Sequence, residues 1–300
     1  MPRIEHLGST ARLYTLGPEG TFSDKAAQRL KVLLTSTGSA PPEVVYTRTI
    51  PEVVARAEAD PDSLGVFPIE NSDTGTVLFA QDALVRHRVA ILLEINIRVR
   101  FSLLANAPPG EVRRIFSQPV AADQCNFYMA EHMPQAVLEF TRSNMESGHR
   151  FLAEEGEGPL AAIVPFEFGE EHPTWRAGVD IQNYPENTTR FLVVRERGAA
   201  GDPDPTLGKT SLWVEPREDR PGLLYDLLSV FNRHRLNLCR LESRPAKVRP
   251  WTYVFFIDFN NNEGTPDCLA ELERGDHTLN VLGSFDTLED DEGKALVEGP

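Results

Sequence analysis

The sequence predicts an α/β protein with two lobes, followed by a smaller domain of the ferredoxin-like type. Over the first two thirds of the chain, short apolar runs alternate with helical patterns, and this alternation restarts once after a strand-rich stretch at residues 89–104. Beyond residue 208 the expected elements follow in the order βαββαβ. Two lobes leave a cleft between them, and ligands commonly bind in such clefts.

The first lobe is predicted to begin with alternating strands and helices. Strands are expected at residues 12–17, 44–49 and 64–70. Helices are expected at 23–34, with Ser23 as its N-cap, and at 51–59, with Pro51 in its first turn. The second lobe is predicted from a strand at 113–117, a helix at 121–132 and strands at 136–141 and 159–164.

The last third of the chain is predicted to form a separate domain. Strands are expected at 209–216, 236–245, 251–259 and 279–285, and helices at 221–234 and 265–275. We therefore expect a two-lobed domain over residues 1–198, a linker rich in glycine, proline and aspartate over 199–208, the βαββαβ domain over 209–287, and an acidic tail over 288–300 that frays.

The composition excludes several classes of protein. Lysine and arginine number 30 against 45 aspartates and glutamates, and the net charge of -15 argues against a general nucleic-acid or anionic-membrane binder. No run approaches the roughly 18 apolar residues of a membrane span. The three cysteines, Cys125, Cys239 and Cys268, form no CxxC pair, so neither a disulfide framework nor a metal site is expected. The start of the chain has no apolar leader, which predicts a cytoplasmic protein.

Three polar clusters interrupt the α/β region at strand ends. GPEGTFS, residues 17–23, sets the hydroxyls of Thr21 and Ser23 at a helix start, which suits a carboxylate ligand or simply caps the helix. PIENSDTGTV, residues 68–77, ends an apolar strand with Glu70, Asn71 and Ser72, which suits a site or a turn held by side-chain hydrogen bonds. NTTRFLVV, residues 187–194, sets two hydroxyls and a guanidinium at the entrance to a buried strand.

Together and in this order, the three clusters resemble those of prephenate dehydratase. The segments KTSLWV, DRPGLLYDLLSVFNRHRLNL and LESRP are similar to the ACT domain at the end of that family's chains, and the resemblance covers residues 12–285. It implies a catalytic domain like the type II periplasmic binding proteins, with its active site between the lobes. It also implies prephenate as substrate, no metal or organic cofactor, and a homodimer or tetramer whose ACT domains bind phenylalanine as allosteric effector.

The resemblance also implies roles for individual residues. Thr189 matches the threonine that donates a proton to the leaving hydroxide, and an unperturbed hydroxyl can do so only as the C–O bond breaks. Arg190 is expected to bind a substrate carboxylate or, alternatively, to act as a structural clamp beneath the cleft. Glu70 is expected to orient a neighbouring donor, since a carboxylate repels a dianion. The other substrate-binding residues implied are Thr21, Ser23, Asn71, Ser72, Asn187 and Phe191.

Two segments match the phenylalanine-binding motifs of the family's ACT domain. The residues implied are Pro221, Gly222, Leu223 and Leu224 at a helix start, and Glu242, Ser243, Arg244 and Pro245 on the partner's side of the pocket. The family usually has alanine at the position of Leu223, so the effector's identity stays open.

The match weakens in the second lobe. Ser117-Gln118-Pro119 stands where the family has Ser-His-Pro, Phe101 replaces a histidine, and residues 142–145 replace a Ser-Thr-Ala helix start. These departures leave two alternatives open. One is a prephenate decarboxylase that does not aromatise its product, and the other is a non-catalytic binding protein that responds to an amino acid. Thr189 and the ACT domain favour dehydration.

Overall fold

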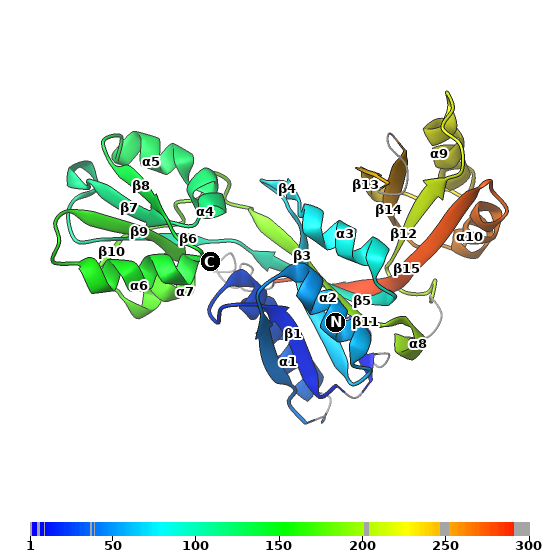
Figure 1. Cartoon of the computed structure of the whole chain (residues 1–300), viewed down its shortest axis with the longest axis horizontal. Helices are drawn as coiled ribbons and strands as arrows, with labels where there is room; N and C mark the ends of the chain where they lie inside the picture. The colour runs from blue at the N-terminus through cyan, green and yellow to red at the C-terminus, as the bar shows by residue number, and fades with distance from the viewer. Residues whose placement is uncertain are drawn as a thin grey trace, which may run out of the picture.

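The computed structural model describes residues 2–4, 7–8, 10–36, 38, 40–200, 204–246 and 252–290. It consists of three bodies in a row, with lobe 2 (residues 99–187) at one end and the C-terminal domain at the other (Figure 1). Lobe 1, formed by residues before 99 and from 188 to 200, lies between them. The predicted fold class, a two-lobed α/β domain followed by a ferredoxin-like domain, is confirmed.

Lobe 1 is built on five main strands in the order β2, β1, β3, β11, β5. Their bounds are Glu43–Thr47, Arg12–Leu16, Ser63–Asn71, Thr188–Glu196 and Val89–Arg98. The first three are parallel, and β11 runs antiparallel to both β3 and β5. Helix α1 (Phe22–Ser36) packs on one face of this sheet, while α2 (Ile50–Ala59) and α3 (Leu78–Arg86) pack on the other. A two-residue strand, β4 (Gly75–Thr76), pairs with the end of β3, and α8 (Arg197–Ala200) follows β11.

Lobe 2 is a second sheet, in the order β10, β6, β9, β7, β8. Its strands are Arg176–Val179, Phe101–Ala105, Leu160–Pro165, Arg114–Ser117 and Val137–Phe140. Its helices are α4 (Pro119–Gln124), α5 (Asn126–His132), α6 (Asn144–Glu154) and α7 (Phe166–Glu171), with a short 3-10 turn, η2 (Pro109–Glu111). Two segments cross between the lobes, and the N–H of Val99 in one donates to the carbonyl of Asn187 in the other at 2.7 Å.

The C-terminal domain has four strands in the order β13, β14, β12, β15. These are Leu238–Pro245, Tyr253–Asn260, Lys209–Pro216 and His277–Leu288. Helices α9 (Leu223–Arg233) and α10 (Thr265–Glu273) cover the outer face, where Leu212, Phe231 and Phe259 form the core. The inner face, with Trp213 and Phe256, packs against lobe 1 near α3.

The sheet of the C-terminal domain continues into lobe 1. The end of β15 pairs in parallel with β5, from Asp286 opposite Leu93 to Leu288 opposite Ile95, and Figure 1 shows this strand running between the two bodies. Gly283 makes the close approach possible: its φ is +154°, and a Cβ there would lie 2.2 Å from the carbonyl oxygen of Ile91. The two bodies therefore share one hydrogen-bonded sheet.

Besides the short elements β4, α7, β10 and α8, which no pattern predicted, four details differ from the expectations. Helix α1 begins at Phe22, so Ser23 lies inside it, and the Thr21 hydroxyl accepts from the N–H of Asp24 instead. The helix expected at 121–132 is two helices interrupted at the buried Cys125. Helix α3 was not predicted, because Leu78, Phe79 and Val85 are exposed and blur the apolar periodicity.

The fourth difference concerns the tail, which does not fray at its start. Asp290 pairs with Arg29 and accepts from the N–H of Arg98, while Glu289 accepts from Asn96 at 3.1 Å. The rest of the predicted tail, from residue 291, and residues 201–203 of the predicted linker lie outside the described residues. In the part of the chain that is described, no helix is both long and apolar enough to cross a bilayer.

Candidate active site

The predicted catalytic cluster lies at one edge of the lobe 1 sheet. Strands β1 and β3 end at this edge, and antiparallel β11 begins there, with Thr189 directly opposite Asn71. Side chains alternate along a strand, so Thr189 shares a face with Phe191, two residues further in. Phe191 is packed with residues of α1, which places the Thr189 hydroxyl on the face that α1 covers.

Asn71 positions Thr189 by hydrogen bonds. Its Nδ2 donates to Oγ1 of Thr189 at 2.9 Å and to Oδ1 of Asn187 at 2.7 Å. Its Oδ1 accepts from the backbone N–H groups of Asp73 at 3.0 Å and Thr74 at 2.9 Å. These bonds fix the orientation of the amide, with its oxygen toward the loop and its nitrogen toward Thr189. Because the Thr189 oxygen accepts a hydrogen bond from Asn71, its O–H remains available to donate to a ligand.

Ser72 ties the loop after β3 to the start of β11. The N–H of Thr188 donates to Oγ of Ser72 at 3.0 Å, and the N–H of Ser72 donates to the carbonyl of Thr188 at 2.9 Å. These two bonds hold the residues on either side of the Asn71–Thr189 pair. The side chain of Ser72 is thus engaged with the backbone, which is the turn alternative considered for this motif.

Gln124, at the end of α4 in lobe 2, is a site residue that the sequence interpretation missed. Its Nε2 donates to Oδ1 of Asn71 at 3.1 Å, so it contacts lobe 1 across the boundary between the lobes, and its side chain is buried. The signal that could have revealed it is an amide side chain next to Ala121, Ala122 and Cys125. These neighbours are buried, and a buried amide needs hydrogen-bond partners. Gln124 therefore helps to orient the amide that holds Thr189.

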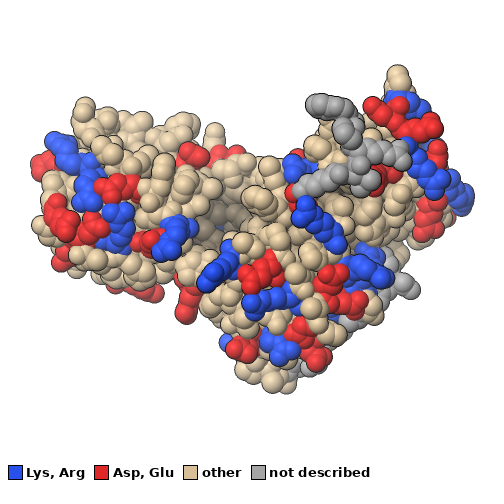
Figure 2. Space-filling model, in the orientation of Figure 1, with Lys and Arg blue, Asp and Glu red and all other residues tan. Residues whose placement is uncertain are grey.

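The lobes meet at further points around the cleft. Nζ of Lys25 on α1 lies 2.8 Å from Oε1 of Glu167 on α7, and the ring of Phe22 packs edge-on against Phe101 with centroids 5.5 Å apart. Phe101, where the family has histidine, thus contributes an apolar contact. Figure 2 shows a hollow between the two lobes whose visible lining is mostly uncharged.

Thr21 and Ser23 lie at the N-terminus of α1. The Thr21 hydroxyl donates to the carbonyl of Pro18 at 2.9 Å, and the carboxylate of Asp24 accepts from the N–H of Gly20 at 2.9 Å. Ser23 is buried, and its carbonyl accepts from the Thr15 hydroxyl at 3.2 Å. The helix terminus adds a partial positive charge to this part of the lobe.

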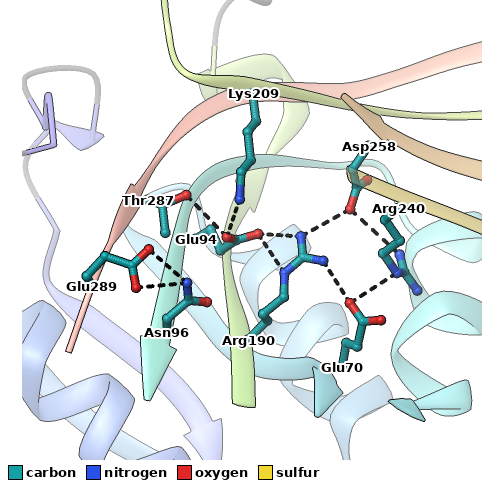
Figure 3. A network of polar contacts seen from close by, with 9 residues as sticks. All are labelled: Glu70, Glu94, Asn96, Arg190, Lys209, Arg240, Asp258, Thr287 and Glu289. Atoms are coloured by element: carbon teal, nitrogen blue, oxygen red, sulfur yellow. Dashed lines mark hydrogen bonds and ion pairs between the residues drawn. The ribbon is translucent and has the colours of Figure 1, made fainter. Parts of the chain in front are cut away.

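Arg190 lies on the face of β11 opposite to Thr189, and the expectation that it binds a substrate carboxylate stays a prediction. Its neighbour Thr189 faces the α1 side, so Arg190 faces the opposite side, where the C-terminal domain lies. Its Nη1 lies 2.7 Å from Oε2 of Glu70, its Nε 3.0 Å from Oε2 of Glu94 and its Nη2 3.3 Å from Oδ2 of Asp258 (Figure 3). The alternative role, a structural clamp, agrees with these contacts.

The charges of this cluster reinforce one another. Burial alone would lower the pKa of Arg190, but the carboxylates of Glu94, Asp258 and Glu70 outweigh burial and raise that pKa. Burial alone would likewise raise the pKa of Glu94, yet the charges of Arg190 and Lys209 hold it below its usual value. Arg190 and Glu94 therefore stay ionised at neutral pH. Glu70 thus orients Arg190, in keeping with the indirect role expected for it.

Two other predicted substrate contacts are buried, and their role in binding stays a prediction. Phe191 is only 1% exposed and packs in the core of lobe 1. Asn187 is also 1% exposed and lies behind Asn71, to which it offers its Oδ1. Phe191 is buried because the strand enters the core immediately after Thr189, whereas Asn187, which precedes the strand, is held by its bond to Asn71.

The altered segments of lobe 2 begin its helices. Oε1 of Gln118 accepts from the N–H of Ala121 at 3.1 Å, and Oγ of Ser143 accepts from the N–H of Glu146 at 3.1 Å. Each side chain thus caps its own helix. The methyl end of Met145 lies against Gly20 of lobe 1, where an added Cβ would lie 2.6 Å from it.

The two predicted effector motifs lie at different places in the C-terminal domain. Gly222 is the N-cap of α9 with a φ of +83°, and Leu223 borders a cavity of about 300 Å³ between α9, α10 and the start of β15. On edge strand β13, Oε2 of Glu242 accepts from the Thr76 hydroxyl at 3.0 Å, and Nη2 of Arg244 lies 3.4 Å from Oδ1 of Asp82. One predicted motif is therefore in direct contact with lobe 1.

The fold and site define a two-lobed α/β enzyme with an attached regulatory domain. A model of the prephenate dehydratase family matches residues 13–199, and a model of the ACT domain matches residues 217–274. The chain belongs to the prephenate dehydratase family and carries an ACT domain at its C-terminal end.

Individual relatives agree with this assignment. A prephenate dehydratase of Methanocaldococcus jannaschii is 33% identical over 278 residues, which are 92% of this chain and 97% of that one. Among solved structures, the prephenate dehydratase of Staphylococcus aureus has a TM-score of 0.76 at 28% identity, over 92% of this chain and all of that one. The prephenate dehydratase of Arthrobacter aurescens in complex with L-Phe has a TM-score of 0.77 at 28% identity, over 94% of this chain and 91% of that one.

Proposed function

We propose that this enzyme converts prephenate to phenylpyruvate, with loss of water and carbon dioxide, in the cleft beside Thr189. The observation that carries the proposal is the Asn71–Thr189 hydrogen bond of 2.9 Å, which fixes the hydroxyl and leaves its proton to donate. Family membership over most of the chain supports the choice of substrate.

The chemistry asks little of the protein beyond positioning. As carbon dioxide leaves, its bonding electrons complete the aromatic ring, and the ring C–O bond breaks so that the oxygen leaves with the bonding pair and departs as water once protonated. Thr189 donates its proton to that oxygen while the bond breaks, because an aliphatic hydroxyl is too weak an acid to transfer its proton earlier. The threonine regains a proton from solvent before the next turnover. The partial positive charge at the N-terminus of α1, where Thr21 and Ser23 lie, supports binding of a substrate carboxylate there.

A product assay tests this proposal. Purified protein incubated with prephenate should yield phenylpyruvate and carbon dioxide in equal amounts. A decarboxylated keto acid that is not aromatic would show the alternative decarboxylase instead. Unchanged prephenate would favour a binding protein and would refute the proposed reaction.

We further propose that phenylalanine is the effector and that the enzyme works in the cytoplasm as a homodimer or tetramer. The solved relative from Arthrobacter aurescens is in complex with L-Phe, and among the described residues β13, with one predicted effector motif, is an edge strand that a second copy could extend. Phenylpyruvate formation measured with increasing phenylalanine should fall. Light scattering of the same protein gives the oligomeric state, and a monomer that phenylalanine still inhibits would contradict the interface site.

A further inference from the structure

A cluster of charged residues joins the catalytic strands to the ACT sheet (Figure 3). Lobe 1 contributes Glu70, Glu94 and Arg190, and the ACT domain contributes Lys209, Arg240 and Asp258. The lobe 1 side carries one excess negative charge and the ACT side one excess positive charge. The two bodies are therefore complementary at this contact.

Arg190 and Arg240 contact the same two carboxylate oxygens. Oε2 of Glu70 lies 2.7 Å from Nη1 of Arg190 and 3.6 Å from Nε of Arg240. Oδ2 of Asp258 lies 3.3 Å from Nη2 of Arg190 and 3.9 Å from Nη1 of Arg240. In both cases Arg190 has the shorter contact, and Arg240 lies just beyond hydrogen-bonding distance.

Arg240 is buried without adequate partners in this arrangement. Its side chain is 5% exposed, and neither Nε nor Nη2 has a hydrogen-bond partner among the described residues. Oδ1 of Asp258 also has none within the same part of the chain. A buried guanidinium with unmade hydrogen bonds is costly, so an arrangement in which Arg240 reaches these oxygens lies close in free energy.

The two arginines sit at informative places in the sequence. Arg190 follows Thr189 on β11, and Arg240 precedes Glu242 by two residues on β13, the strand with one predicted effector motif. A shift of β13 of about 1 Å would bring Arg240 within hydrogen-bonding distance of both oxygens. Of the three carboxylates that Arg190 contacts, only Glu94 would then not be shared with Arg240.

We propose that Arg190 and Arg240 exchange the oxygens of Glu70 and Asp258, and that this exchange transmits effector binding on the ACT domain to Thr189. The inference rests on the proposed function and adds its means of regulation. In the arrangement described, Arg190 holds both oxygens and Thr189 keeps its bond to Asn71, so this is the active state. Effector binding favours the exchanged state, in which the start of β11 loses two anchors.

The test compares Arg240→Lys with the wild-type protein. Lysine keeps the charge but cannot bridge two carboxylates. Turnover without phenylalanine should stay close to wild type, equilibrium dialysis should still show phenylalanine binding, and the half-inhibitory concentration should rise about tenfold or more. Arg233→Lys, on α9 outside the cluster and paired with Glu271, is the matched control and should be inhibited like wild type.

The other possible results also decide whether the exchange takes place. Wild-type inhibition in Arg240→Lys would overturn the exchange, and so would loss of phenylalanine binding, which would make Arg240 part of the pocket. If that variant does not fold, hydrogen exchange of the wild-type protein decides instead: phenylalanine must raise exchange at residues 188–196, and unchanged exchange there would overturn the proposal. If the wild-type protein forms no phenylpyruvate, the proposed function fails, and hydrogen exchange at residues 188–196 tests the switch alone: phenylalanine must raise exchange there in wild type and not in Arg240→Lys.

Discussion

At the scale of single residues, the site depends on one hydroxyl whose direction is fixed by one amide. Thr189→Ala removes the proton donor but leaves the Asn71 amide and the cleft in place. Turnover should fall about 10²- to 10⁴-fold, while prephenate binding is kept. Thr189→Ser restores the hydroxyl and should recover much of the rate. Single-turnover formation of phenylpyruvate measures both, and an unchanged rate in the alanine variant would remove Thr189 from the mechanism.

Gln124 contributes to the same geometry from the other lobe. In Gln124→Glu, a carboxylate faces Oδ1 of Asn71 where an N–H group lay at 3.1 Å, and the two acceptors repel. The Asn71 amide then loses its fixed orientation, so kcat should fall about tenfold or more with a smaller change in KM. Equal losses in kcat and in substrate affinity would show instead that Gln124 only holds the lobes together.

At the scale of elements, β5 contributes a buried carboxylate to the contact with the ACT sheet. The folded-state pKa of Glu94 lies below the usual 4.5, so its stabilising effect is complete above that pH and is lost as pH falls through the lower value. Glu94→Gln should lower the free energy of unfolding by about 2 kcal/mol at pH 7 and make its decline toward acid pH shallower. Urea unfolding measured at several values between about pH 3 and pH 7 gives both quantities.

Glu52→Gln is the control for this comparison. Glu52 pairs with Arg56 on the surface of α2, and such exposed pairs contribute little. Its unfolding free energy at pH 7 should stay near that of the wild type. An acid decline in Glu94→Gln as steep as in the wild type would show that other carboxylates govern the pH dependence.

The same elements show what sequence patterns can predict. The order of most strands and helices followed from apolar periodicity, and the polar clusters that contain Asn71 and Thr189 were recognised at strand ends, while the roles of these residues came from the family resemblance. The direction of the Arg190 side chain could also have been predicted from the sequence. Adjacent residues on a strand face opposite sides, so Thr189 and Arg190 cannot both face the cleft. The contact of Gln124 with Asn71 could not be predicted from the sequence, since it joins residues 53 positions apart in different lobes.

At the scale of the whole molecule, lobe 1 is in contact with both other bodies. The Lys25–Glu167 ion pair and the Gln124–Asn71 hydrogen bond link it to lobe 2 around the cleft. The Thr76–Glu242 hydrogen bond links it to the ACT domain, close to the end of β3. The residues that hold Thr189 are thus a few positions along the chain from residues that the regulatory domain touches, which is the physical basis for communication between them.

The pairing of β15 with β5 has a consequence for dissecting this enzyme. A fragment ending at residue 200 would lack Asp286–Leu288 and would leave the apolar rim of Val89–Arg98 open to other chains. Such a fragment should aggregate, as size-exclusion chromatography would show, and co-expression of residues 204–290 should rescue it. A monodisperse, active fragment would contradict this. The regulatory module thus also covers an edge strand of the catalytic sheet.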